Sequence, residues 1–250
     1  MFVIGIDIGT TCTKALVLAK DGRIAASGSR GYELIRNGRH VEQRAEDWTE
    51  AAAAAVREAL KEIGGSGVEA ISLSTQGAST VAVDKNGQTI GNALTWMDSR
   101  SVEEAAELEK KLSNDYIYAA TGWKVNPSLD AAKIMHMKKQ TRYQKASAFL
   151  STLEFMNRFL TGSAVIDPTN AAMRQLYHIE DECWDDGLLE ASGIREQELT
   201  PVLPSGSEVG KLCEKAADLM GLRTGIPVFN GVHDQYCAAI GAGAFHEGDM

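Results

Sequence analysis

The sequence predicts an α/β domain with an inserted helical region, and two observations carry this prediction. Short β-rich segments open the chain ("FVIGIDI", residues 2–8) and return near its end ("GIPVFNG", 225–231), whereas the pattern from residue 126 to residue 162 is mostly helical. No low-complexity tract, strong composition break or convincing internal repeat divides the 250 residues. We therefore expect a single domain over residues 1–250.

The first 34 residues predict three consecutive antiparallel strands. After "FVIGIDI" come the turn "GTT", the segment "TKALVLA" (13–19) and, beyond "KDGR", the segment "IAASGSRGYEL" (24–34). The period changes to that of a helix in "EDWTEAAAAAVREALKEIGG" (46–65). There Asp47 with Glu50 is typical of a helix cap, and Gly64 with Gly65 is typical of a helix end.

The remaining elements follow from alternation, period and turn residues. "VEAISLSTQG" predicts a short buried strand that ends in polar residues, and "STVAVDKNGQTIGNALTW" predicts a hairpin turning at 85–87. "SRSVEEAAELEKKL", "STLEFMNRFLTG", "WDDGLLEASGI" and "KLCEKAADLMGL" predict helices, and "ASAFL" a strand. "LTPVLPSGSEVG" predicts an irregular connection, because proline and glycine interrupt both periods.

Charge and composition narrow the class of partner. The formal net charge of -9 argues against broad attachment to nucleic acid or to an anionic membrane. No stretch is long and apolar enough to cross a bilayer, and the N-terminus lacks the features of a signal peptide, so we expect a cytoplasmic protein. The four cysteines form no CxxC pair, which favours reduced thiols over a metal site.

The segment "IGIDIGTTCTK" is the first candidate for chemistry. It brings one carboxylate (Asp7), two hydroxyls (Thr10 and Thr11), backbone N–H groups and Lys14 into a few residues. These are the groups that a magnesium-bound polyphosphate needs, although neither GxxxxGK[ST] nor GxGxxG is present. The alternative is a plain hairpin turn in which the aspartate and the threonines bond to nearby backbone.

Asp234 is the second candidate, because it follows the apolar run "IPVF" where a strand becomes a small-residue helix. The polar groups at 230–235 would then lie at the carboxyl end of a sheet, which is where open α/β folds bind ligands. The alternative is that Asp234 caps the helix "QYCAAIGAG". A cap has its oxygen occupied by backbone N–H groups, whereas a general base keeps one free for a substrate.

Five blocks of the sequence resemble, in order and spacing, those of the FGGY family of carbohydrate kinases. They are "GIDIGTTCTKALVLAKDG", "ISLSTQGASTVAVDKNGQTIGNALTWMDSR", "DPTNAAMRQLYHIEDECWDDGLLEASGI", "LTPVLPSGSEVG" and "GLRTGIPVFNGVHDQYCAAIGAG", which together cover essentially the whole chain. The resemblance implies a transferase that uses ATP and Mg²⁺ to phosphorylate an alcohol group of a small-molecule sugar, ketose or polyol.

The resemblance also implies a fold and a missing partner. Members of the family have two lobes of the RNase H-like type, as in actin and the Hsp70 ATPase, and sugar and ATP meet in the cleft between the lobes. We therefore expect an RNase H-like lobe with a mixed sheet flanked by helices and a helical insertion. Residues 1–250 would be the N-terminal, sugar-binding domain of a longer kinase, inactive without the C-terminal ATP-binding domain. Because relatives are often dimers, the resemblance also allows a homodimer.

Residue roles follow from the positions that match the family. Asp234 stands at the position of the catalytic base, which takes the proton from the attacking hydroxyl and also contacts the substrate. Asp7 matches the aspartate associated with Mg²⁺ and the phosphates. Thr10, Thr11 and Lys14 match the phosphate-facing turn, where many relatives carry arginine in place of the lysine.

Gln76 and Gly77 fall in the sugar-contacting block of the family, where this chain departs from two familiar patterns. It reads "QGAS" instead of the "QRET" of glycerol kinases or the "QMHG" of xylulose kinases, so neither substrate carries over. In "WMDSR", Asp98 and Arg100 either touch the substrate or form an internal ion pair that fixes the pocket wall. The 126–130 loop is either a further sugar contact or a plain turn.

Two other classes of function remain as alternatives. A non-catalytic carbohydrate-binding or regulatory module of the same fold would bind sugar without hydrolysing ATP. An actin-like or chaperone-like ATPase is disfavoured, because its relatives do not resemble the "WMDSR" and "GVHDQ" blocks. His233, beside the expected base, is more often structural than functional as a lone histidine.

Overall fold

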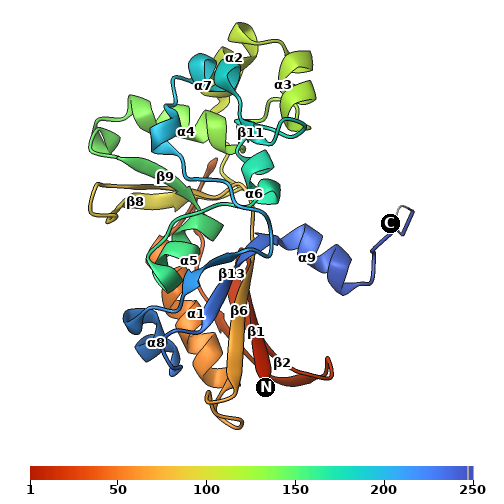
Figure 1. The fold of residues 1–250 in the computed structure, drawn as a ribbon. Coiled ribbons are helices and arrows are strands. Elements are labelled where there is room, and N and C mark those ends of the chain that lie inside the picture. Colours follow the sequence, from red (N-terminus) through yellow and green to blue (C-terminus); the bar gives the residue numbers. More distant parts are fainter. Residues whose placement is uncertain (247, 250) are drawn as a thin grey trace.

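A computed structural model of the chain describes residues 1–246 and 248–249, and its architecture is that of a mixed α/β lobe (Figure 1). Within these residues the larger sheet has the order β12-β13-β6-β1-β2-β3. Its strands are β1 (Phe2–Ile8), β2 (Cys12–Ala19), β3 (Ile24–Gly31), β6 (Val68–Thr75), β12 (Glu208–Lys211) and β13 (Pro227–His233). The mixed sheet and its flanking helices confirm the predicted fold class.

The pairing of this sheet places three strand ends at one edge. β1 runs antiparallel to β2, as predicted, but parallel to β6, which in turn is parallel to β13. Ile8 and His233 are both in register with Thr75, so β1, β6 and β13 end side by side. Polar residues that follow these strands are thereby gathered at one edge of the sheet, as expected for ligand sites in α/β folds.

Helices cover one face of the large sheet. Because side chains alternate between the two faces of β1, Ile4, Ile6 and Ile8 point to the same face. There they form a buried cluster with the fully buried Trp48 of α1 (Ala45–Ala59). The helices α5 (Thr152–Thr161) and α8 (Glu214–Met220) pack beside α1 on the same cluster. The opposite alternation leaves Val3 of β1 and Leu16 of β2 exposed on the other face.

The part of the chain outside the large sheet contains more than the helical region predicted at 126–162. It includes a five-stranded antiparallel sheet in the order β4-β5-β8-β7-β9, formed by β4 (Ile35–Asn37), β5 (His40–Gln43), β7 (Thr80–Val83), β8 (Thr89–Leu94) and β9 (Ala148–Ser151). A second hydrophobic cluster joins this sheet to α2 (Val102–Lys111), α3 (Asn114–Thr121), α4 (Asp130–Lys139) and α7 (Asp186–Ser192). The described residues also form α6 (Pro168–Met173), β10 (Tyr177–His178), β11 (Cys183–Trp184) and α9 (Asp234–Gly241).

Several predicted boundaries are wrong. α1 begins at Ala45 after an N-cap Arg44 without a side-chain hydrogen bond, so Asp47 lies in the first turn and is not the cap. The helix ends at Ala59 instead of reaching Gly64. The segment predicted to be irregular ends in β12, and the helix expected from residue 211 begins at Glu214. In contrast, α5 has the predicted cap, a capping box at Ser151, and the predicted end at Gly162.

Close packing of β13 against β6 requires a glycine. A Cβ atom at Gly231 would lie 2.1 Å from the backbone oxygen of Leu73, a distance that no side chain tolerates. Asn230, expected among the polar groups at the strand end, is instead buried inside β13, where its Oδ1 accepts a hydrogen bond from Asn157. The strand therefore continues to His233, and its polar end begins there.

No helix in the described residues combines the length and the apolar character needed to span a membrane.

Candidate active site

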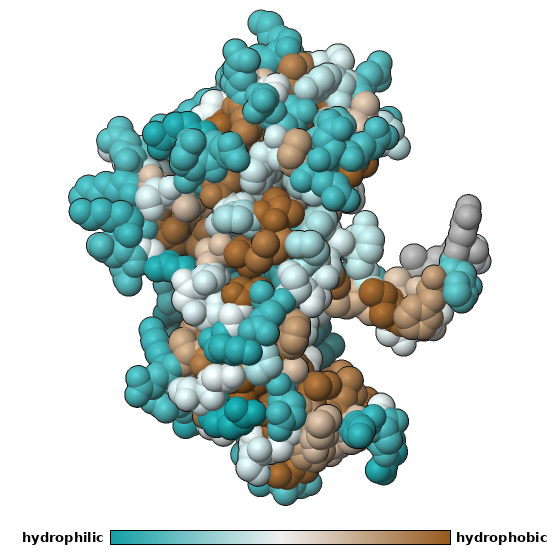
Figure 2. All heavy atoms as spheres, in the orientation of Figure 1, coloured by the Kyte–Doolittle hydropathy of each residue, from teal (hydrophilic) through white to brown (hydrophobic). Residues whose placement is uncertain are grey.

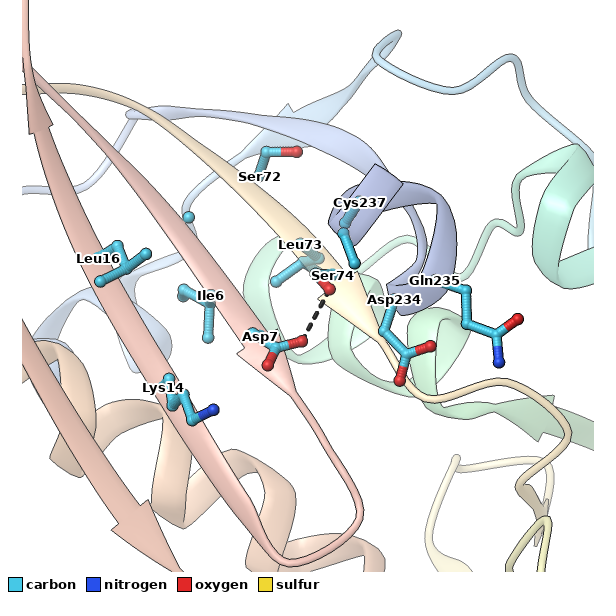
Figure 3. Close-up of a pocket in the computed structure, with 12 residues that line it drawn as sticks. Ile6, Asp7, Lys14, Leu16, Ser72, Leu73, Ser74, Asp234, Gln235 and Cys237 are labelled. Carbon is cyan, nitrogen blue, oxygen red and sulfur yellow. Dashed lines mark hydrogen bonds between the residues drawn. The ribbon is translucent and has the colours of Figure 1, made fainter. Parts of the chain in front are cut away.

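A cavity of about 810 Å³ lies where the strands β1 and β6 meet the start of α9. Figure 3 shows Asp7 near the end of β1, Ser74 near the end of β6 and Asp234 at the start of α9, with Lys14 on the neighbouring β2. The structure thus brings together three of the predicted residues, Asp7, Lys14 and Asp234, which lie far apart in the sequence.

Asp234 is the first residue of α9 and does not cap it. The N-cap position belongs to His233, and no side chain provides a cap hydrogen bond there. With 37% of its surface exposed, the Asp234 side chain keeps an accessible carboxylate at the cavity. The capping alternative is therefore wrong for this residue.

The electrostatic surroundings of Asp234 favour proton uptake. Partial burial raises the pKa of this carboxyl above its usual range, and the negative charge of Asp7 adds to the increase, while His233 opposes it. Nε2 of His233 lies 3.3 Å from Oδ1 of Asp234. Burial in turn lowers the pKa of His233. A raised carboxyl pKa is what a general base near neutral pH requires.

Asp7 is held by a side chain that the sequence prediction missed. Its Oδ1 accepts a hydrogen bond of 2.7 Å from Oγ of Ser74 on the adjacent parallel strand. Lys14 is the register partner of Asp7 across the β1–β2 ladder, so both side chains project from the same face of the sheet. The alternation of serines in "SLST" was the signal available for Ser74, because it places Ser72 and Ser74 on one face.

The turn after β1 is anchored from two directions. Oγ1 of Thr10 accepts a hydrogen bond of 2.8 Å from the indole of Trp96, and the Thr10 carbonyl accepts one of 2.6 Å from Gln43. Thr11 is exposed. Neither threonine lines the cavity. The turn therefore lies next to the carboxylates but is not part of the cavity that Asp7 and Asp234 share.

Gln76 and Gly77 directly follow β6 and are packed into the protein. Gln76 is 2% exposed, and its Nε2 donates a hydrogen bond of 2.9 Å to Gln43. A Cβ atom at Gly77 would lie 2.6 Å from Cδ2 of His233, so glycine allows the histidine ring to sit against this backbone. These two residues are thus close to the Asp234 segment, although they do not line the cavity.

Asp98 lies in a buried ion pair. It is fully buried, and its oxygens accept hydrogen bonds from the guanidinium of Arg100 (2.6 Å at the shortest) and from the backbone N–H of Val41. Arg100 also reaches Glu42 at 2.7 Å. The internal ion pair, one of the two alternatives from the sequence, is therefore present. In the 126–130 loop, Asn126 accepts the backbone N–H of Ser128, which is an ordinary turn.

The end of β13 is also held by a hydrogen bond that no local sequence pattern indicated. The backbone N–H of His233 donates a hydrogen bond of 2.9 Å to Oγ1 of Thr169. Thr169 is itself held by Asp167, which accepts its hydroxyl at 2.6 Å and its N–H at 3.0 Å. The N-terminus of α6 therefore fixes the residue that precedes Asp234.

In the described part of the chain, no three or more His, Cys, Asp or Glu side chains are grouped as metal ligands. The donor set still fits Mg²⁺, which keeps several waters and is commonly bound by one or two carboxylates together with substrate phosphates. Asp7 and Asp234 line one cavity and present carboxylate oxygens of that kind.

The sheet order, the helical layers and the carboxylates at one edge define an actin-like ATPase lobe. A model described as "FGGY family of carbohydrate kinases, N-terminal domain" matches residues 2–241. The chain therefore belongs to the FGGY family of carbohydrate kinases.

Similarity to known proteins extends over the whole chain. The chain is 28% identical over 249 residues to xylulose kinase of Staphylococcus xylosus, covering 98% of the chain and 52% of that protein. It is 31% identical to a glycerol kinase of Xanthobacter autotrophicus, covering 99% of the chain and 51% of that protein. The crystal structure of xylulose kinase from Rhodospirillum rubrum superposes with a TM-score of 0.95 at 26% identity, covering 99% of the chain and 52% of that structure. The chain spans about half the length of the curated relatives it matches.

Proposed function

We propose that this chain is the sugar-binding lobe of an ATP-dependent kinase that phosphorylates a hydroxyl group of a sugar, ketose or polyol. The observation that carries the proposal is the position of Asp234 on the same cavity as Asp7 and Lys14, at the edge where β1, β6 and β13 end. The family assignment supports the reaction class.

In the proposed reaction Asp234 acts as general base. It accepts the proton of the substrate hydroxyl as that oxygen attacks the γ-phosphorus of ATP, and ADP leaves with the electron pair of the broken P–O bond. The proton remains on Asp234 until the product departs. The raised pKa of Asp234 supports this role, because a more basic carboxylate accepts the proton more readily.

The phosphate side of the site is assigned to Asp7, Thr10, Thr11 and Lys14. Asp7 would hold Mg²⁺, since Ser74 bonds Oδ1 and orients the carboxylate, and the bound ion would neutralise charge on the transferring phosphates. The Lys14 ammonium and the threonine turn would contact phosphate oxygens. Gln76, Gly77 and Asp98 are assigned to the sugar side, where they support residues around the site: Gly77 contacts His233, and Asp98 holds Arg100.

A second domain is part of the proposal. α9 has no buried residue, and Tyr236 and Ile240 on it are 56% and 53% exposed. Figure 2 shows brown hydrophobic residues along this projecting arm. The exposed Val3 and Leu16 lie on the uncovered face of the sheet nearby. These apolar surfaces are consistent with cover from an ATP-binding domain such as the other half of the relatives' length provides.

The test measures ADP release by the complete kinase, this chain joined to its ATP-binding domain, against a panel of ketoses, polyols and aldonates. We expect turnover with one of these classes of substrate and none by residues 1–250 alone. In the cell, we expect the reaction to take place in the cytoplasm, where ATP is supplied. Asp234→Asn should lower kcat by about 10²- to 10⁴-fold, while the matched control Asp218→Asn, at an exposed position on α8, should not.

Two outcomes would contradict the proposal. Near-full activity of Asp234→Asn would remove the base assignment. Sugar binding without ADP release by the complete protein would favour the non-catalytic carbohydrate-binding module instead.

A further inference from the structure

Gln43 occupies a position where the two sheets meet. It is the last residue of β5 in the five-stranded sheet and is fully buried. Its side chain reaches two segments of the six-stranded sheet, the Thr10 turn after β1 and Gln76 after β6. It also bonds Trp48 of α1.

The hydrogen bonds of Gln43 fix which way its amide points. The indole N–H of Trp48 can only donate, and it lies 3.2 Å from Oε1 of Gln43. The carbonyl of Thr10 can only accept, and it lies 2.6 Å from Nε2 of Gln43. A flipped amide would therefore set donor against donor and acceptor against acceptor, so one orientation alone satisfies both partners.

This orientation determines that of Gln76 as well. Because Oε1 of Gln43 is an acceptor, Gln76 must present its Nε2, at 2.9 Å. Oε1 of Gln76 is then left buried without a partner among the described residues. The backbone N–H of Gln76 also donates to the carbonyl of Ile8 at 2.9 Å. The end of β6 is thus tied to the end of β1 and, through Gln43, to the Thr10 turn.

We propose that Gln43 is a positioning residue of the site, one that sets the Thr10 turn relative to the Gln76–Gly77 segment. Its catalytic consequence rests on the proposed function, in which that turn faces the phosphates and that segment borders the sugar. Gln43 itself touches neither ligand. It acts by holding the Thr10 turn and the Gln76–Gly77 segment in a fixed relative position, through a buried amide with a single allowed orientation.

The test can be read on the 250-residue chain without turnover. Trp96 donates its indole N–H to Oγ1 of Thr10, so its indole resonance in a ¹⁵N-labelled sample reports on the Thr10 turn. Gln43→Met removes the amide, and we expect a shifted Trp96 indole resonance with faster hydrogen exchange. Gln76→Met removes only the bond between the two glutamines, so Gln43 still holds Thr10 and the Trp96 signal should stay near its wild-type position. Gln88→Met makes the same substitution at an exposed glutamine and should change nothing.

A second variant keeps the test decisive if Gln43→Met fails to fold. Gln43→Glu keeps the shape of the side chain, but its carboxyl can donate to the Thr10 carbonyl only while protonated. We expect the Trp96 indole resonance of this variant to shift with pH beyond any change in the wild-type protein. A general loss of core packing would not produce such a titration. A folded Gln43→Met with an unchanged Trp96 signal, or a Gln43→Glu variant whose signal titrates no more than the wild type, overturns the proposal.

Kinetics on the complete kinase separates this proposal from the proposed function. If the protein phosphorylates a sugar, Gln43→Met should lower kcat/KM about 10- to 100-fold, the scale expected for misplaced groups. If no sugar is phosphorylated, the function fails, and the indole measurements still decide whether Gln43 positions the turn. Wild-type kcat/KM in Gln43→Met would overturn the catalytic consequence.

Discussion

Nε2 of His233 lies 3.3 Å from Oδ1 of Asp234, and the histidine is far more buried than its neighbour, with side-chain exposures of 8% and 37%. These two consecutive residues, at the junction of β13 and α9, thus pair a basic imidazole with an acidic carboxyl group. Burial disfavours the charged form of both, lowering the pKa of His233 and raising that of Asp234.

His233→Gln should raise the pKa of Asp234 further, because the histidine is the group that lowers it. In its proposed role as base, Asp234 accepts a proton only when it is ionised, so the acid limb of the pH profile of kcat/KM should move to higher pH. The same displacement should appear in the chain alone, in the ¹³C titration of the Asp234 carboxyl. His40→Gln, at an exposed position, serves as the control. A midpoint that stays in place or moves to lower pH contradicts the assignment.

Ser74→Ala should weaken the phosphate side of the site. The variant removes the 2.7 Å hydrogen bond to Oδ1 of Asp7, and bonds to charged groups contribute about 1.5–3 kcal/mol. Because part of this is recovered from water, we expect the KM for MgATP to rise about tenfold in the complete kinase. Ser72→Ala changes the same strand two residues earlier, opposite Gly5, and should have a smaller effect. Equal effects of both variants would mean that Ser74 does not orient Asp7.

Arg174→Met should destabilise the lobe strongly. The Arg174 guanidinium is fully buried, with Nη1 2.5 Å from Glu154 and Nε 3.6 Å from Asp130, and both carboxylates are buried too. Removing the cation takes the ion-pair partner away from both buried carboxylates, and breaking a buried pair in this way typically costs about 3–5 kcal/mol. Urea unfolding of the chain measures this loss. Arg223→Met breaks a half-exposed pair with Glu69 and should cost about 0–1 kcal/mol. A small loss at Arg174 would show that the buried network relaxes around the change.

The sequence predicted the large sheet better than the small one, for a physical reason. β1 and β2 alternate buried and exposed side chains, and α1 carries a continuous buried face, so local periodicity was sufficient. β4 spans only Ile35–Asn37 and all its residues are exposed, so it had no pattern to detect. β12 spans only Glu208–Lys211, follows a proline-containing segment and pairs with β13, from which the helix α8 separates it.

For the site, the sequence and its family resemblance brought Asp7 and Asp234 together, because Asp7 lies near the end of one apolar strand and Asp234 directly follows another. The residues that hold them were missed. Ser74, Gln43 and Thr169 act through hydrogen bonds to residues more than 30 positions away, and such contacts exist only once the chain is folded. For Asp98, the "WMDSR" block left both an ion pair and a substrate contact open and favoured the ion pair, which is the contact that the structure contains.

The order of strands in the large sheet also determines when the site can appear as the chain folds. β6 lies between β1, from the start of the chain, and β13, from its end. Non-local pairings of this kind form slowly, because the entropy of closing a long loop is lost before the contacts stabilise it. An intermediate in which β1, β2 and β6 have assembled would carry Asp7 and Ser74 in place but would lack Asp234. During synthesis on the ribosome, the carboxylate of the proposed base would therefore arrive after Asp7 and Ser74, as the last of these three groups of the lobe.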